Sequence, residues 1–311
     1  MPNPVLLFAC HDVPAEPWLV ALQRAAPELE VRLSPDEGPP ETVDFGLAWA
    51  TPPGFWNRFP RLRAIFSLGA GVEHLLASGA PAHVPLVRMT DPGLARDMSD
   101  FVLMRVLHYH RGMHLYLRQQ EAQVWTPIRP PRPNGRTVGV MGLGELGAHC
   151  ACTLAEAGFR TRGWSRSAKA VEGVATFAGR DELPRFLEGC EILVCLLPLT
   201  AETRDILDAK LFAALPQGAC LIQVGRGLQL VEADLLAALD AGRIAAATLD
   251  VFRQEPLPQG HPFWSRADIT VVPHAAAFTY PETAAEVVAE NVRRLQAGEV
   301  PIGLVDRALG Y

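Results

Sequence analysis

Short apolar runs alternate with longer amphipathic segments along almost the entire chain. In the first third, the runs VLLFAC, FGLAWA, RAIFSL and PLVRM have the length and composition of buried strands, and a helical or turn-forming segment follows each. A second series consists of TVGVMG, RTRGWS, ILVCLLP, GACLIQV, AATLDVF and DITVVPH. This alternation is typical of βαβ units with parallel sheets, so the sequence predicts an α/β fold.

The two series are separated by a helix and a proline-rich segment. Apolar residues recur at intervals of three and four over residues 94–120, which predicts one long helix. Residues 126–136, TPIRPPRPNGR, cannot continue a helix and predict a linker. A last helix is expected from about Glu282 to Ala297, because Pro281 precedes it and Gly298 follows it.

Length and composition restrict the class of protein. A chain of 311 residues is long enough for two domains. The net charge of −6 argues against a nucleic-acid surface, and no apolar run is long enough to span a membrane. The six cysteines form no CxxC pair, and the N-terminus lacks the basic start of a signal peptide. We therefore expect a cytoplasmic protein with reduced thiols, whose partners are small molecules.

A glycine motif follows the first strand of the second series. In VGVMGLGELG, Gly142, Gly144 and Gly147 form G-x-G-x-x-G between a predicted strand and a predicted helix. The glycines permit a tight turn, and the helix N-terminus offers N–H groups to a pyrophosphate. The motif predicts dinucleotide binding by Gly142, Leu143, Gly144, Glu145, Leu146 and Gly147.

The next strand ends in GWSRS, where NAD-preferring sites usually place Asp or Glu. Here Ser165, Arg166, Ser167 and Lys169 supply hydroxyl groups and positive charge instead. Because a 2′-phosphate is bound by such groups and repelled by a carboxylate, the loop favours NADP(H), with NAD(H) as a second cofactor.

Three later strands end in stretches that carry an arginine, carboxylates and a histidine. They are IQVGRG with Arg226, LDVFRQEPLP with Asp250 and Glu255, and VVPHAAA with His274. An arginine can bind a carboxylate and polarise a carbonyl, and a histidine beside a carboxylate can donate a proton while hydride arrives from a nicotinamide. This set suits the reduction of a 2-oxo acid.

Several ordered stretches resemble the D-isomer-specific 2-hydroxyacid dehydrogenases, and within them the glyoxylate/hydroxypyruvate reductase A branch. They include SLGAGVEHLL, LLPLTAETRDIL, LPQGACLIQVGRG, LDVFRQEPLP, PHAAA and VDRALGY, so the resemblance covers almost the whole chain. One departure is Gln223, which stands where the family commonly has asparagine.

The resemblance implies roles for individual residues. Arg226 would bind substrate, and His274, paired with Glu255, would act as the acid in reduction. Trp49 would either close the substrate pocket or simply pack on its strand. The substrate carboxylate would bind to Leu68, Gly69, Ala70 and Gly71, and the cofactor would also contact Leu197, Pro198, Val224, Gly225, Arg226, Asp250 and His274.

The resemblance also implies an architecture. A flavodoxin-like substrate domain would comprise residues 1–97 and 281–311, and a Rossmann coenzyme domain, residues 98–280, would be inserted into it. Catalysis would take place in the cleft between these two doubly wound domains, and the protein would be a homodimer.

The expected activity is NADPH-dependent reduction of glyoxylate and hydroxypyruvate to glycolate and D-glycerate. One alternative is a reductase of bulkier 2-oxo acids such as phenylpyruvate, and another is a dinucleotide-sensing protein without turnover. His110 and His114 have a spacing that could serve zinc, but no acidic or cysteine ligand is near them in sequence, so we expect helix packing and no metal.

Overall fold

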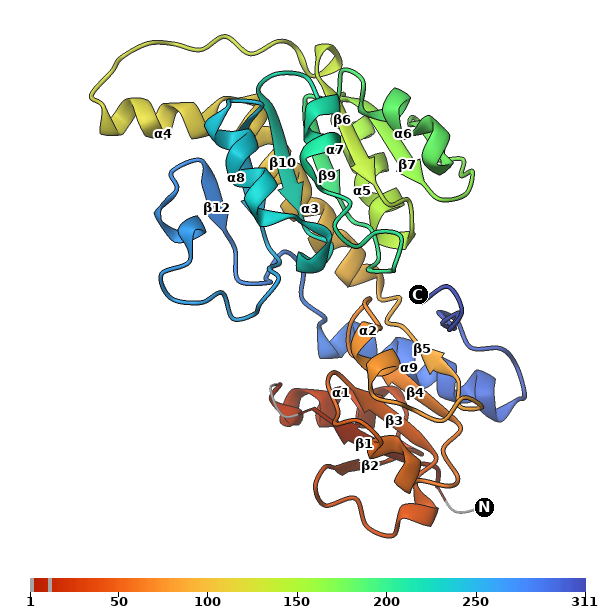
Figure 1. The fold of residues 1–311 in the computed structure, drawn as a ribbon. Helices are drawn as coiled ribbons and strands as arrows, with labels where there is room; N and C mark the ends of the chain where they lie inside the picture. Colours follow the sequence, from red (N-terminus) through yellow and green to blue (C-terminus); the bar gives the residue numbers. More distant parts are fainter. Residues whose placement is uncertain (1–2, 11–12) are drawn as a thin grey trace. The chain divides into compact units, whose positions relative to one another are not determined.

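The computed structural model describes residues 3–10 and 13–311. The chain forms two compact units, the first made of Met1–Leu94 and Thr279–Tyr311 and the second of Ala95–Phe278 (Figure 1). Unit 2 is therefore inserted into unit 1 along the chain. The boundaries expected from the sequence, 97/98 and 280/281, lie three and two residues after these boundaries of the two compact units.

Unit 1 contains a five-stranded parallel sheet. Its order is β2 (Glu30–Leu33), β1 (Val5–Ala9), β3 (Phe45–Ala48), β4 (Ala64–Ser67) and β5 (Leu86–Val87), which is the flavodoxin-like order. Side chains from α1 (Ala15–Ala25) and α9 (Pro281–Gln296) join one hydrophobic core, and those from α2 (Glu73–Ala77) and the turn η2 (Phe55–Arg58) join another. Leu6 and Leu7 of β1 belong to different cores, as alternation along a strand buried on both faces requires.

Unit 2 contains a seven-stranded parallel sheet. Its order is β12 (Ile269–Val271), β11 (Ile244–Leu249), β10 (Ala219–Gln223), β9 (Ile192–Cys195), β6 (Thr137–Met141), β7 (Arg160–Ser165) and β8 (Ala175–Ala178). The chain runs from β6 outward to β8, then continues from β9 on the other side of β6. This is the Rossmann arrangement with its switch point between β6 and β9. The predicted α/β class with two parallel sheets is confirmed.

Helices cover both faces of the second sheet. Apolar residues of α3 (Pro92–His110) and α5 (Glu145–Glu156) share one core with strand residues such as Val138 and Ile192. The opposite core includes residues of α6 (Gly179–Leu187), α7 (Ala209–Ala214) and α8 (Glu232–Asp240). Burial on both faces explains why these strands are nearly continuous apolar runs.

One prediction about the segment before β6 needs correction. The single helix expected over residues 94–120 is two helices, α3 and α4 (Met113–Glu121), because Gly112 adopts a left-handed conformation with φ 68° between them. The proline-rich residues 126–136 contain no α-helix, as expected, and connect α4 to β6 inside unit 2. The edge strands β2 and β8 were not predicted at all.

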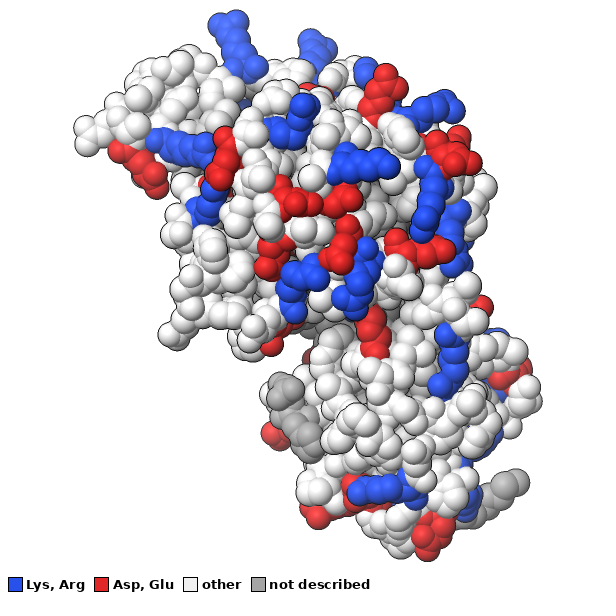
Figure 2. All heavy atoms as spheres, viewed as in Figure 1, with Lys and Arg blue, Asp and Glu red and all other residues white. Residues whose placement is uncertain are grey.

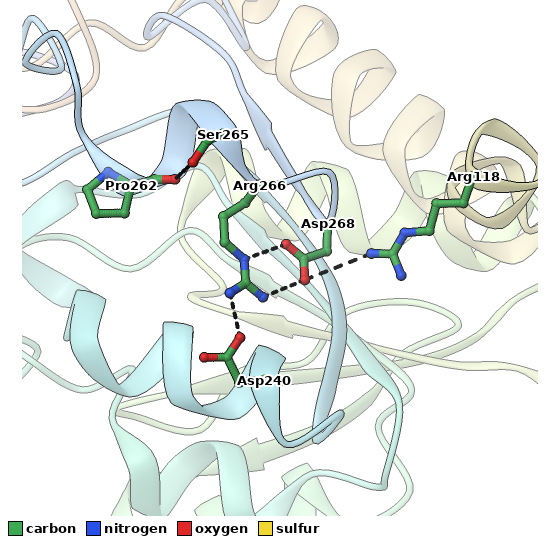
Figure 3. A network of polar contacts seen from close by, with 6 residues as sticks. All are labelled: Arg118, Asp240, Pro262, Ser265, Arg266 and Asp268. Atoms are coloured by element: carbon green, nitrogen blue, oxygen red, sulfur yellow. Dashed lines mark hydrogen bonds and ion pairs between the residues drawn. The ribbon is translucent and has the colours of Figure 1, made fainter. Parts of the chain in front are cut away.

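An ion-pair network fixes the outer edge of the second sheet (Figure 3). Arg266 donates two hydrogen bonds to Asp268, with distances of 2.8 and 2.7 Å, and one to Asp240 at the end of α8. Arg118 of α4 lies 3.9 Å from the same Asp268 carboxylate. The hydrogen bonds from Arg266 are the main reason why the pKa of Asp268 is lowered.

Arg266→Met should lower the free energy of unfolding by about 1 kcal/mol at neutral pH, because a largely buried carboxylate loses its charged donor. Since the pKa of Asp268 is lowered in the folded chain, this stability is fully present above the ordinary carboxyl pKa and is lost as the pH falls through the lowered value. Urea titrations at several pH values should therefore show the difference shrinking below about pH 4. Arg96→Met is the control, because the ion pair between Arg96 and Asp100 is exposed. An equal loss of unfolding free energy in both variants would contradict the stabilising role of the Arg266–Asp268 pair.

Candidate active site

The candidate residues of unit 2 follow the ends of neighbouring parallel strands. The hydrogen-bond ladder continues past the strands themselves: Leu196 N–H donates to Met141 O, Val224 N–H to Cys195 O, and Asp250 N–H to Gln223 O. Val272 N–H likewise donates to Leu249 O at 2.9 Å. The turns that follow β6, β9, β10, β11 and β12 therefore stand in a row along one edge of the sheet, where open α/β sheets bind ligands.

The glycine turn after β6 has the shape that a pyrophosphate needs. Gly142 has a φ of 103°, and a Cβ on Gly147 would lie only 1.7 Å from the Gly142 carbonyl oxygen. A Cβ on Gly144 would meet no heavy atom within 4 Å. Two glycines are thus required by the fold, and the third leaves open space before the N-terminus of α5. These residues fit a dinucleotide phosphate.

The other residues predicted to contact the cofactor divide into buried and exposed ones. The side chains of Leu143, Leu197 and Val224 are buried in the cores of unit 2, so only their backbone groups could face a ligand. Glu145 is exposed at the start of α5, as expected for a carboxylate beside a phosphate site.

The GWSRS loop lies beside the glycine turn, because Gly142 N–H donates to Trp164 O at 2.8 Å. Ser165 is nearly buried, and its hydroxyl donates to Ser167 O at 2.7 Å, which shapes the loop. Arg166, Ser167 and Lys169 are exposed. Two cationic side chains and a hydroxyl group are therefore accessible at the end of β7.

His274 and Glu255 form a hydrogen-bonded pair. His274 Nδ1 lies 2.8 Å from Glu255 Oε2, and the two side chains are 39% and 36% exposed. Glu255 Oε1 also accepts the Phe252 N–H at 2.9 Å, so both carboxylate oxygens are held. The pair is fixed in place and still accessible to a ligand.

The charge of Glu255 determines which imidazole nitrogen is available for chemistry. Burial alone would raise the pKa of Glu255, but the hydrogen bond from His274, the Phe252 N–H and the positive charges of His274 and Arg226 together lower it. An ionised carboxylate can only accept hydrogen bonds, so Nδ1 of His274 carries a hydrogen and donates a hydrogen bond to Glu255. Nε2 is then the atom that can exchange a proton with a substrate.

The backbone at His274 is held in an uncommon conformation by Asp250. His274 has a φ of 52°, and its N–H donates to Asp250 O at 2.9 Å. Asp250 Oδ1 accepts the N–H groups of Ala275 and Ala276 at 2.7 and 3.0 Å. Burial raises the pKa of Asp250, although these N–H groups and His274 oppose that shift. Asp250 thus orients the turn that presents His274.

Arg226 follows β10, and two buried glutamines hold its backbone. Gln223 Nε2 donates to Arg226 O at 2.9 Å, and Gln229 Oε1 accepts the Arg226 N–H at 2.9 Å. The departure from asparagine at Gln223 therefore preserves a polar role. Sequence reasoning missed Gln229, whose only signal was a polar residue within the otherwise apolar stretch GLQLV.

In unit 1, the predicted carboxylate-binding loop, residues 68–72, follows β4. Ser67, which is fully buried, donates to Gly71 O at 3.0 Å and accepts the Gly69 N–H at 3.2 Å. Trp49 is half-buried and covers the loop, because a Cβ on Gly69 would lie 2.6 Å from its ring. The Trp49 ring also packs at a tilt of 40° against the His74 ring, with centroids 4.3 Å apart. Sequence reasoning missed Ser67 and His74.

The histidines of the α3–α4 region pack against aromatic rings. His110 lies edge-on to Phe159 and His114 edge-on to Tyr109. Burial is the largest cause that lowers the pKa of His114, to about 4. Over residues 3–10 and 13–311, no cluster of three or more His, Cys, Asp or Glu side chains could hold a metal ion. On the face drawn in Figure 2, positive and negative side chains are interspersed.

Comparison with known proteins identifies the family of the chain. The sequence profile of the D-isomer specific 2-hydroxyacid dehydrogenase NAD binding domain matches residues 103–276. Glyoxylate/hydroxypyruvate reductases A from Yersinia enterocolitica and Serratia proteamaculans are 43% and 44% identical to the chain, over 96% of it and of each relative.

Solved structures extend the likeness to the whole fold. A D-isomer specific 2-hydroxyacid dehydrogenase from Xanthobacter autotrophicus, in complex with NADPH and MES, has a TM-score of 0.96 at 44% identity and covers 99% of this chain and 100% of its own. An NADPH-dependent glyoxylate/hydroxypyruvate reductase from Sinorhizobium meliloti, in complex with NADP and sulfate, has a TM-score of 0.93 at 36% identity, with the same coverage. The chain belongs to the D-isomer specific 2-hydroxyacid dehydrogenase family.

Proposed function

We propose that the protein reduces small 2-oxo acids, glyoxylate and hydroxypyruvate first, to glycolate and D-glycerate with NADPH. The observation that carries this proposal is the pair of His274 and Glu255, held on the same sheet edge as Arg226 and the glycine turn. The relatives named as glyoxylate/hydroxypyruvate reductases support the choice of substrate, and the NADPH and NADP in two similar structures support the choice of cofactor.

In the mechanism that we propose, the residues of unit 2 bind, polarise and protonate the substrate. When bound, the nicotinamide cofactor would supply the hydride that is transferred to the keto carbon. Arg226 binds the substrate and polarises its carbonyl, and His274 donates the Nε2 proton to the carbonyl oxygen. Glu255 keeps its negative charge because its pKa is lowered, so it stabilises the imidazolium before transfer and orients the ring afterwards.

For the cofactor, we propose that the turn of residues 142–147 binds the pyrophosphate and that the GWSRS loop selects the 2′-phosphate. Arg166 and Lys169 are exposed at the end of β7, and neither Asp nor Glu stands in GWSRS. A carboxylate there would favour NADH, so its replacement by cationic and hydroxyl groups favours NADPH. Unit 2 would then be the coenzyme domain and unit 1 the substrate domain.

For the substrate, we propose that residues 68–72 of unit 1 bind the carboxylate through backbone N–H groups, with Trp49 limiting the size of the acid. The ring of Trp49 lies against Gly69 and His74, so it occupies space beside this loop. A large ring in that position would favour small acids over phenylpyruvate. The intact set of Arg226, Glu255 and His274 favours an enzyme over a dinucleotide sensor.

We further propose a cytoplasmic homodimer whose interface includes α4 and the loop that follows it. Apolar side chains are exposed there in the single chain: Met113, Leu115, Leu117, Val124 and Trp125. Exposed apolar surface of this kind marks protein–protein contacts. Four buried free thiols, among them Cys190 and Cys195, fit a reducing compartment. Over the described residues, no helix is long and apolar enough to span a membrane. A monomeric mass by light scattering would contradict the dimer.

The activity is tested by initial rates of NADPH and NADH oxidation with glyoxylate, hydroxypyruvate, pyruvate and phenylpyruvate. We expect the fastest turnover with NADPH and the two small acids.

His274→Asn, whose asparagine tolerates the positive φ, should lower kcat by about 100-fold or more with little change in NADPH binding. His83→Asn, at an exposed position of unit 1, is the control. Full activity of the His274 variant would remove this residue from the mechanism; tight NADPH binding without turnover of any acid would favour the sensor.

The glycine turn makes a second, contrasting prediction. Gly144→Ala should fold normally, because open space surrounds the new methyl group, but should weaken NADPH binding by about 10-fold or more as it fills that space. Gly147→Ala should instead destabilise unit 2, because its methyl group would meet backbone. Thermal unfolding and fluorescence titration with NADPH distinguish the two effects. Undiminished NADPH binding by the Gly144 variant would place the pyrophosphate elsewhere.

A further inference from the structure

Two fully buried amide side chains lie between the turn that follows β9 and the arginine turn that follows β10. Gln223 is the last residue of β10, and Gln229 ends the short helical turn η4 (Gly227–Gln229). Both have no exposed surface. Burying an amide without hydrogen-bond partners costs several kcal/mol of folding free energy, so the partners of these two side chains indicate their role.

The amide of Gln229 is satisfied at both ends. Its Nε2 donates to the carbonyl oxygens of Leu197 and Pro198 at 2.8 and 3.0 Å. Its Oε1 accepts the Arg226 N–H at 2.9 Å and Gln223 Nε2 at 3.3 Å. Its donor end bonds to one turn and its acceptor end to the other, so one side chain joins both turns.

The second amide completes the arrangement around Arg226. Gln223 Nε2 donates to Arg226 O at 2.9 Å, so both backbone polar groups of Arg226 are bonded to buried side chains. Gly225 leaves room for this contact, because a Cβ there would lie 2.4 Å from Gln229 Oε1. The backbone at Arg226 therefore has little freedom to shift relative to residues 197–198.

We propose that Gln229 is a positioning residue for the reaction, a role that rests on the proposed function. It does not reach a substrate; it fixes Arg226 against the Leu197–Pro198 turn through an unbroken chain of hydrogen bonds. Arg226 can then bind the acid in the orientation that hydride transfer requires, since small errors in position have large effects on rate. Gln223 assists by holding the Arg226 carbonyl.

The test replaces Gln229 by methionine, which keeps its length and removes every hydrogen bond. Gln229→Met should lower kcat/KM for glyoxylate by about 10-fold or more, through a higher KM and a lower kcat, while the Kd of NADPH changes by less than about 3-fold. Gln217→Met is the matched control: Gln217 also donates to two consecutive carbonyls, Ala241 O and Gly242 O, but it is exposed and precedes β10. This control should stay within about 2-fold of wild type in both quantities.

Gln229→Glu keeps the test decisive if the methionine variant does not fold. The introduced carboxyl group still accepts the Arg226 N–H, but as a carboxylate it cannot donate to Leu197 and Pro198. Burial beside carbonyl oxygens favours its protonated form, which restores one donor. The ratio of its kcat/KM to that of wild type should therefore be below one at pH 8 and rise as the pH is lowered.

Contrary outcomes are distinguishable. Unchanged kcat/KM in a folded Gln229 variant, or an equal loss of NADPH binding and of acid turnover, would overturn the positioning role. If wild type reduced no 2-oxo acid, the proposed function itself would fail. The role of Gln229 could then be tested without activity, by measuring amide hydrogen exchange of residues 223–229. Exchange in Gln229→Glu as slow as in wild type would then show that the amide does not restrain Arg226, and would overturn the inference on its own terms.

Discussion

The parallel hydrogen-bond register of the seven-stranded sheet determines where the candidate catalytic side chains of unit 2 stand. Strands β6, β9, β10, β11 and β12 end at the same edge, and the ladder continues for one more residue into the turn after each of them. The glycine turn follows β6, and the three residues Arg226, Asp250 and His274 follow β10, β11 and β12. These positions are far apart in the chain, but they lie along one edge of the sheet. A shift of one residue in any pairing would turn the side chains of that strand to the other face and displace the site.

This register is supported by polar contacts buried beneath the site. Arg105 of α3 donates to Thr248 of β11 and Thr270 of β12, at 2.8 and 2.9 Å, and Tyr109 contacts the same Thr248. Burial raises the pKa of Tyr109 to about 12, so the phenol stays neutral. These contacts hold α3 against the two strands that lead to Asp250 and His274. The turns that carry Asp250 and His274 thus follow strands that are held in place by buried hydrogen bonds.

Much of the fold could be predicted because its signals are local. Strands buried on both faces are apolar runs, and the strands that sequence reasoning missed, β2 and β8, are edge strands with mixed composition, EVRL and ATFA. The helix over residues 94–120 was predicted too long because Gly112 is only weakly unfavourable in a helix by propensity; its positive φ is a tertiary result. Gln229 and Ser67 were missed because a polar residue within an apolar stretch does not reveal its role until its hydrogen-bond partners are known.

The sequence by itself determined the α/β class, the family, the glycine turn and the residue types of the proposed catalytic set, because each depends on neighbours along the chain. Only the tertiary structure decided that Nδ1 of His274 meets Glu255, that Asp250 supports the left-handed turn at His274, and that Gln223 and Gln229 hold Arg226. These contacts join residues on different strands and turns. Their distances follow from sheet register and packing, which no local pattern specifies.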